Sequence, residues 1–299
     1  MARSDVLIDV QELREQLSNP AWRIVDCRFE LTEPDKGFLH YLENHIPGAV
    51  YAHLDRDLAA PVTAETGRHP LPDPAAFAGT LGRWGISRRS KVVVYDGGNG
   101  AIASRLWWML RWMGHQAVRL LDGGLAAWKN ADFPLESDPP EIEPAVFEGS
   151  PDPSMIVRTG EVEKALARGT PYLLVDARDP ARFAGITEPI DRVAGHIPGA
   201  RNFPFNDSLS EDGRWRSQDD LRRVWVAALE GAGGSAETAD WTAMCGSGVT
   251  ACHLAVSAEL AGVARPRLYP GSWSEWIRDP ARPIAPCRAE PEPSPAEGR

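Results

Sequence analysis

The sequence predicts an α/β protein made of two copies of one fold, each a mostly parallel sheet flanked by helices. The first reason is an internal repeat at an offset of about 150 residues. Four landmarks recur in the same order: VDCR (25–28) with VDAR (175–178), HIPGA (45–49) with HIPGA (196–200), 92–114 with 241–262, and LLDGGLAAW (120–128) with LYPGSWSEW (268–276). The second reason is that each copy alternates short apolar runs with amphipathic ones, as parallel α/β sheets do.

The elements of each copy follow from local patterns. Apolar runs rich in β-branched residues predict buried strands in the first copy at 22–27 and 91–96. Helices are expected there over 10–17, 73–85 and 103–114. Asp73 and Pro74 form a typical helix start. The second copy repeats the pattern, with strands at 171–177 and 242–244 and helices at 217–229 and 249–262.

The duplication sets the expected domain boundaries. A length of 299 residues suits two domains of about 150 residues. We expect a first domain over 1–135 and a second over 155–286. Residues 136–154, rich in Pro and acidic residues, are typical of an extended linker. The Pro- and Glu-rich tail, 287–299, is expected to be disordered.

Composition excludes several classes of function. The formal charge of −10 disfavours nucleic acid and anionic membranes as partners. No apolar run reaches the roughly 20 residues that span a bilayer. The N-terminus has no apolar stretch typical of a secretion signal. Four cysteines without a CxxC pair argue against disulfides and a structural zinc site. We therefore expect a cytoplasmic protein with neither metal nor cofactor.

The stretch CGSGVTAC (245–252) holds the candidate nucleophile. Cys245 ends a predicted strand and precedes a helix, the place where open α/β sheets bind ligands. Gly246 and Gly248 allow a tight turn whose N–H groups converge. Together with the helix N-terminus, these groups stabilise negative charge, which makes the thiol easier to ionise. The loop predicts a thiolate held by amides and able to attack sulfur or carbon.

The alternative is that Cys245 is a small core residue, since free cysteines are often buried and inert. The first copy has DGGNG at the matching place, so Asp96 stands where the cysteine would be. This asymmetry favours one active site per chain, although an accidental cysteine would produce it too. Features common to both copies are more typical of the fold than of catalysis, so we assign His45 and His196 to structure. Cys27 and Cys252 are expected in the core.

Two tandem copies with HIPGA motifs and the loop CGSGVTAC resemble the two-domain rhodanese-type sulfurtransferases over residues 5 to 286. The loop, followed by GSWSEW, most resembles the 3-mercaptopyruvate sulfurtransferases of that family. The resemblance implies that Cys245 attacks the thiol sulfur of 3-mercaptopyruvate, releases pyruvate and holds a persulfide. A thiol acceptor such as thioredoxin, a small thiol, or cyanide then takes the sulfur.

The resemblance also implies the site residues. Arg178 and Arg182 match positions that bind the substrate carboxylate and carbonyl, the alternative being surface salt bridges. Ser247 would relay a proton through His69 and Asp55 in the first copy to the departing pyruvate. His69 could instead merely pack in its Pro-rich loop. The remaining loop residues, Gly246, Gly248, Val249 and Thr250, would surround the substrate; the Thr250 hydroxyl would cap the helix or bond the sulfur. Trp273 could flank the site.

Three rival functions are open to comparison. Thiosulfate sulfurtransferases of this family have basic residues directly after the cysteine, where this chain has Gly246 and Ser247. A phosphatase loop, Cys-x5-Arg, would need arginine at 251, where Ala251 stands. A non-catalytic binding module would suit the first copy alone. One departure from the family is Pro270, where Asp usually precedes GSW; it leaves the fine substrate preference open.

Overall fold

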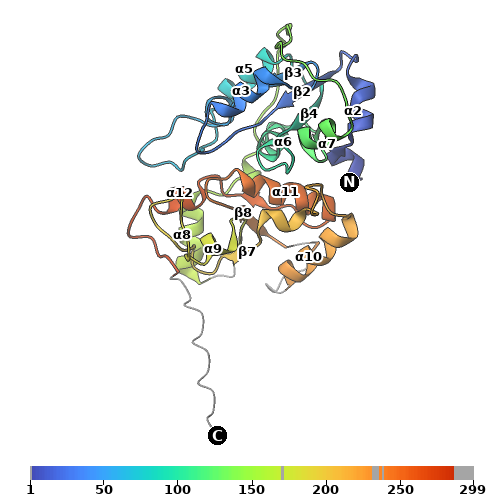
Figure 1. Ribbon diagram of the computed structural model, residues 1–299. Helices are drawn as coiled ribbons and strands as arrows, with labels where there is room; N and C mark the ends of the chain where they lie inside the picture. Colours follow the sequence, from blue (N-terminus) through green and yellow to red (C-terminus); the bar gives the residue numbers. More distant parts are fainter. Residues whose placement is uncertain (1, 170–171, 231–235, 238, 286–299) are drawn as a thin grey trace.

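The computed structural model describes residues 2–169, 172–230, 236–237 and 239–285. The predicted tail and Cys287 lie outside this range. Figure 1 shows the chain as two α/β halves, the first above the second, with helices α6 and α11 between them. No helix among the described residues is long and apolar enough to cross a membrane.

The first half is a parallel five-stranded sheet in the order β1-β5-β4-β2-β3. Its strands are β1 (Leu7–Ile8), β2 (Trp22–Asp26), β3 (Ala49–Tyr51), β4 (Lys91–Tyr95) and β5 (Val118–Leu121). Its helices are α1 (Arg3–Val6), α2 (Val10–Gln16), α3 (Lys36–Glu43), α4 (Leu54–Asp57), α5 (Pro74–Arg83), α6 (Ala103–Trp112) and α7 (Gly124–Asn130). As expected, Asp73 caps α5 by accepting from the N–H groups of Ala75 and Ala76, with Pro74 as the first helical residue.

The second half repeats this arrangement with a parallel four-stranded sheet in the order β7-β6-β8-β9. Its strands are β6 (Leu173–Asp176), β7 (Arg201–Asn202), β8 (Trp241–Met244) and β9 (Arg267–Leu268). Its helices are α8 (Thr159–Arg168), α9 (Pro180–Phe183), α10 (Gln218–Glu230), α11 (Thr250–Ala261) and α12 (Ser272–Trp276), with 3₁₀ turns at Pro153–Met155 and Phe205–Ser208. The predicted fold class, two α/β copies with parallel sheets flanked by helices, is confirmed.

Strand register brings the carboxyl ends of β6 and β8 to one edge. Asp176 pairs with Met244, the last residues of their strands. The segments that follow, toward Arg182 and from Cys245, therefore begin side by side. This edge is where parallel α/β sheets place their sites.

The two halves share one hydrophobic core. Side chains of α6, including Trp107 and Trp108, belong to the same buried cluster as Leu254 and Val256 of α11. Every residue of α11 from 251 to 261 is buried, as expected for a helix enclosed on all sides. Residues 137–152, which join the halves, contain neither helix nor strand, and Phe147 is packed into the core. The exact domain boundaries stay a prediction.

The two HIPGA histidines lie in matching surroundings. Nδ1 of His45 is 2.7 Å from the Tyr41 carbonyl oxygen, and the two rings stack. Nδ1 of His196 is 2.9 Å from the Phe183 carbonyl oxygen, and these rings also stack. Each histidine is hydrogen-bonded to a backbone carbonyl of a neighbouring helix, which fits the structural role assigned to both.

Candidate active site

Cys245 lies between β8 and α11, with its sulfur turned toward the amides of its own loop. Sγ accepts hydrogen bonds from the backbone N–H groups of Ser247 at 3.4 Å and Gly248 at 3.1 Å. Although only 2% exposed, the residue lines a cavity of about 900 Å³ between the two halves. The thiol is thus shielded from bulk water but faces a space that can hold a substrate.

In the first half the same kind of loop surrounds a carboxylate. One carboxylate oxygen of Asp96 accepts from the N–H groups of Gly98 and Gly100, and the other from Ile102 and Ala103, all between 3.0 and 3.1 Å. Three amides of the loop and the first amide of α6 thus surround one carboxylate. The duplicated loop is an anion cradle, and in the second half the sulfur of Cys245 occupies it.

Two glycines shape the Cys245 loop. Gly248 has φ of +77°, and a Cβ there would lie 2.5 Å from the carbonyl oxygen of Pro270. Gly246 has an ordinary φ, but a Cβ would lie 2.7 Å from Nη2 of Arg68. Gly248 is therefore required by backbone geometry, whereas Gly246 makes room for a charged side chain.

The predicted relay is assembled across the two halves. Oγ of Ser247 lies 2.8 Å from Nδ1 of His69, and Nε2 of His69 lies 3.2 Å from Oδ1 of Asp55. If Nε2 carries the proton and donates to Asp55, Nδ1 is free to accept the Ser247 hydroxyl proton. Burial lowers the pKa of His69 despite Asp55, so its ring is neutral at pH 7. The hydrogen bond from His69 lowers the pKa of Asp55, which remains a carboxylate.

Arg178, which was expected to bind the substrate, is held by contacts within its own half. Its side chain is 1% exposed and bonded to its neighbours: Nε lies 2.9 Å and Nη2 2.7 Å from Asp176, and Nη2 donates to the Gly195 carbonyl. The first half has the same arrangement, with Arg28 bound to Asp26. Arg178 is therefore a feature of the fold that fixes the loop after β6, although it does line the cavity.

Arg182 lies closer to the Cys245 loop, and Arg68 of the first half lies beside the same loop. Arg182 pairs with Glu188 at 2.8 Å and with Asp191 at 3.1 Å. Asp191 also pairs with Arg68 from the first half. Both guanidinium groups stand over the Cys245 loop, since Nη2 of Arg68 and of Arg182 lie 2.7 and 3.6 Å from a Cβ built on Gly246. Nε of Arg68 is buried without a partner.

Sequence reasoning missed Arg68. It stands beside His69 in TGRHPLP, but no spacing connects it to Cys245, about 180 residues away. Only the packing of one half on the other brings the two together. The one sequence signal that pointed here was the resemblance that placed His69 in the site.

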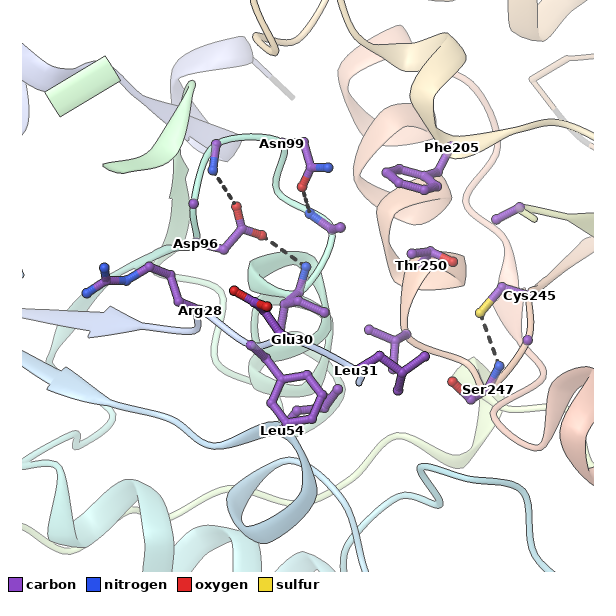
Figure 2. A pocket seen from close by; sticks show the side chains of 18 of the residues that line it. Arg28, Glu30, Leu31, Leu54, Asp96, Asn99, Phe205, Cys245, Ser247 and Thr250 are labelled. Atoms are coloured by element: carbon purple, nitrogen blue, oxygen red, sulfur yellow. Dashed lines mark hydrogen bonds between the residues drawn. The ribbon is translucent and has the colours of Figure 1, made fainter. Parts of the chain in front are cut away.

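The other predicted residues fall into two groups. Val249 is the N-cap of α11 and Thr250 its first residue; both line the cavity. Figure 2 shows Thr250 beside Phe205, across from Asn99 and Leu31 of the first half. The expected helix cap by Thr250 is wrong, because no side chain caps α11. Trp273 does not line the cavity; it is fully buried under the Arg178 guanidinium, 4.9 Å from the ring centroid.

Metal chemistry has no candidate residues in the part of the chain that the structure describes. No three His, Cys, Asp or Glu side chains there converge on a point that could hold an ion. The chemistry available is that of a thiol in an amide cradle, two arginines and a Ser–His–Asp chain.

Comparison with known proteins agrees with this arrangement. A model of the rhodanese-like domain matches residues 9–131 and again 159–279. The chain belongs to the rhodanese-like family. Both copies are recognised, which confirms the predicted tandem organisation.

The names of similar proteins refer to two different sulfur donors, 3-mercaptopyruvate and thiosulfate. A probable 3-mercaptopyruvate sulfurtransferase of Pseudomonas aeruginosa is 49% identical over 282 residues, covering 93% of this chain and 97% of the relative. A putative thiosulfate sulfurtransferase of Mycobacterium tuberculosis is 39% identical, covering 95% and 98%. The structure of 3-mercaptopyruvate sulfurtransferase from Leishmania major superimposes on this rhodanese-like chain with a TM-score of 0.79 and 32% identity, covering 91% of this chain and 74% of the other.

Proposed function

We propose that this chain is a 3-mercaptopyruvate sulfurtransferase with Cys245 as its nucleophile. The thiolate attacks the sulfur of 3-mercaptopyruvate and forms an S–S bond. The carbon–sulfur bond breaks, and its electron pair leaves with pyruvate as the enolate. A proton then reaches the enolate carbon, so that pyruvate departs and a persulfide remains on Cys245. The amides of Ser247 and Gly248 stabilise the negative sulfur.

The observation that favours this donor is the chain from Ser247 through His69 to Asp55. Pyruvate enolate has to be protonated on carbon. His69 accepts at Nδ1, so it can take up the proton of the substrate thiol through the Ser247 hydroxyl and return it by the same route to the enolate carbon, while Asp55 stabilises the imidazolium formed in between. Transfer from thiosulfate releases sulfite and forms no carbanion. A proton relay beside the sulfur therefore has a task with 3-mercaptopyruvate that it would lack with thiosulfate.

Local charge favours the same donor. Arg68 and Arg182 provide two positive charges at the loop, but Asp191 and Glu188 cancel them formally. Burial raises the pKa of the Glu188 carboxyl, but hydrogen bonds from Arg182 outweigh this and hold it below its usual range. The cluster can redirect guanidinium N–H groups to a single carboxylate, yet has no net charge for a dianion. Arg68 and Arg182 thus replace the predicted pair Arg178 and Arg182 as ligands of the substrate carboxylate.

The acceptor of the sulfur is a thiol, which we propose to be thioredoxin or a small thiol, with cyanide as an artificial substitute. Such an acceptor enters the cavity, which is lined by the Cys245 loop and by Glu30 and Leu31 of the first half (Figure 2). Cys245 is only 2% exposed and faces the cavity, so the acceptor thiol has to enter the cavity to reach the persulfide.

Steady-state kinetics with both donors, on wild type and Cys245→Ser, tests the proposal. We expect a strong preference for 3-mercaptopyruvate in kcat/KM and near-complete loss of transfer in the variant. Mass spectrometry of the wild type should show one added sulfur on the peptide containing Cys245. A preference for thiosulfate would identify the rival donor. Absence of any added sulfur would instead favour a non-catalytic rhodanese-like module.

A further inference from the structure

Arg105 is a buried cation at the contact between the two halves. It belongs to α6 of the first half, and none of its surface is exposed. Nη1 donates to the carbonyl of Gly248 at 3.1 Å, and Nη2 to the carbonyls of His69 at 3.0 Å and Leu58 at 3.3 Å. One guanidinium thus joins the Cys245 loop to the loop that holds the histidine of the relay.

The Gly248 contact couples this cation directly to the sulfur. The N–H of Gly248 donates to Sγ of Cys245, while its carbonyl accepts from Arg105. Binding the carbonyl fixes the orientation of Gly248 in the loop. The positive charge of Arg105 therefore lies one residue away from the atom that has to become negative.

No carboxylate of the described chain forms an ion pair with Arg105, and its Nε has no partner. Arg111, further along the same helix and also buried, differs because it pairs with Glu259 at 2.7 Å. Burying an unpaired charge is expensive, so a lone buried guanidinium calls for a counter-charge. Burial lowers the pKa of Arg105, and the groups that oppose this shift are two thiols, Cys252 and Cys245.

We propose that Arg105 is a positioning residue that favours the ionised sulfur at Cys245 and holds the active loop against His69. Its counter-charge is the thiolate or persulfide itself. The inference rests on the proposed function, in which Cys245 is the reactive thiol. It assigns a task to α6 of the copy that lacks a cysteine.

Other groups also face this sulfur and bear on its ionisation. Burial raises the pKa of Cys252 to about 12, so this neighbouring thiol stays neutral and does not compete for the charge. Arg105 contributes to lowering the pKa of His69, after burial, and so favours a neutral ring beside an anionic sulfur. The remaining charged groups that line the same cavity are Arg28, Glu30, Arg68, Asp96, Arg178, Asp179, Arg182, Glu211 and Asp212.

The test is the pH dependence of alkylation of Cys245 by iodoacetamide, followed by peptide mass spectrometry in a Cys287→Ser background. Arg105→Met removes the charge while keeping much of the volume. We expect alkylation at pH 7 to slow about tenfold and the midpoint of the pH profile to rise by about one unit. Arg105→Lys keeps the charge and should retain the wild-type midpoint. Arg111→Met, a buried arginine lost from the same helix, is the matched control and should also retain it.

The outcomes separate the two proposals, because alkylation needs no sulfur donor. A folded Arg105→Met variant with the wild-type profile overturns this inference alone. Ready alkylation of a wild-type protein that transfers no sulfur overturns the proposed function alone. Should Arg105→Met fail to fold, the same alkylation profile is measured on Arg105→Gln, which also removes the charge. If neither neutral variant folds while Arg111→Met does, Arg105 is a packing requirement and the inference is wrong.

Discussion

His253 lies at the contact between the two halves and should make the stability of the folded chain depend on pH. Its ring, fully buried in α11, stacks on Trp215 with centroids 4.0 Å apart and meets Phe205 edge-on. Nε2 lies 3.1 Å from the carbonyl oxygen of Asn99 in the first half, whereas Nδ1 has no partner. Burial lowers the pKa of His253 from the ordinary 6.5 to about 3. The ring is thus held neutral wherever the chain is folded at moderate pH.

Below about pH 6.5, His253 takes up a proton in the unfolded chain but stays neutral in the folded chain. With the folded pKa below the unfolded one, the contribution of His253 is fully present above about pH 6.5 and is lost as the pH falls toward 3. Between pH 7 and pH 5, where the folded ring stays neutral, the free energy of unfolding should fall by about 2 kcal/mol from this residue. The loss follows from proton uptake by the unfolded state alone.

Urea denaturation of wild type and His253→Gln at both pH values measures this term. Glutamine can still donate to Asn99 but does not titrate. Burial also lowers the pKa of His53, His69 and His115, so both proteins weaken in acid, and only the difference counts. The variant should lose about 2 kcal/mol less than wild type between pH 7 and pH 5. His40→Gln, outside the core, should behave as wild type. Equal losses in wild type and His253→Gln would refute the reasoning.

Three further predictions concern the site itself. Ser247→Ala should lower kcat with 3-mercaptopyruvate about a hundredfold or more, the usual range for a lost general acid, while residual transfer from thiosulfate stays near wild type. Equal losses with both donors would contradict the relay. Arg68→Ala and Arg182→Ala should each raise KM for 3-mercaptopyruvate about ten- to a hundredfold, since a charged hydrogen bond contributes about 1.5–3 kcal/mol. Arg278→Ala, which removes only a bond to the Thr66 carbonyl in the same loop, is the control for initial-rate measurements and should leave KM unchanged. Gly248→Ala should lower the free energy of unfolding by about 2 kcal/mol, because it combines strained backbone with a clash on Pro270. Gly246→Ala should lose less in the same urea titration, since only the end of the Arg68 side chain has to move; the reverse order would refute this account.

Local sequence patterns were sufficient to predict the fold and the loop that surrounds the Cys245 sulfur. Apolar periodicity placed β2, β4, β6 and β8, and the repeat of landmarks placed two copies. The thiol in its amide cradle followed from Cys245, Gly246 and Gly248 in one short stretch, because a turn between strand and helix is a local structure. The partners of Ser247 came from family resemblance, since nothing in the spacing of His69 and Asp55 points to a residue in the other half.

Arg178 shows where the reasoning could have been stricter. The motifs VDCR and VDAR occur in both copies, and the same argument that assigned the HIPGA histidines to structure applies to their arginines. The structure bears this out, with Arg28 and Arg178 each bound to the aspartate two residues before it. Arg68 and Arg105 were beyond reach for a different reason: their contacts depend on how one half packs against the other, which no periodicity encodes.

The two copies use one anion cradle in opposite ways. In the first half the side chain of Asp96 fills the cradle and holds the loop by hydrogen bonds, and this loop lines the cavity. In the second half the cradle holds the sulfur of Cys245, which changes its charge during each transfer. The first half contacts this loop through His69, which is hydrogen-bonded to Ser247, and through Arg105, which donates to the Gly248 carbonyl. Through these two contacts the copy without a thiol takes part in the site of the copy that has one.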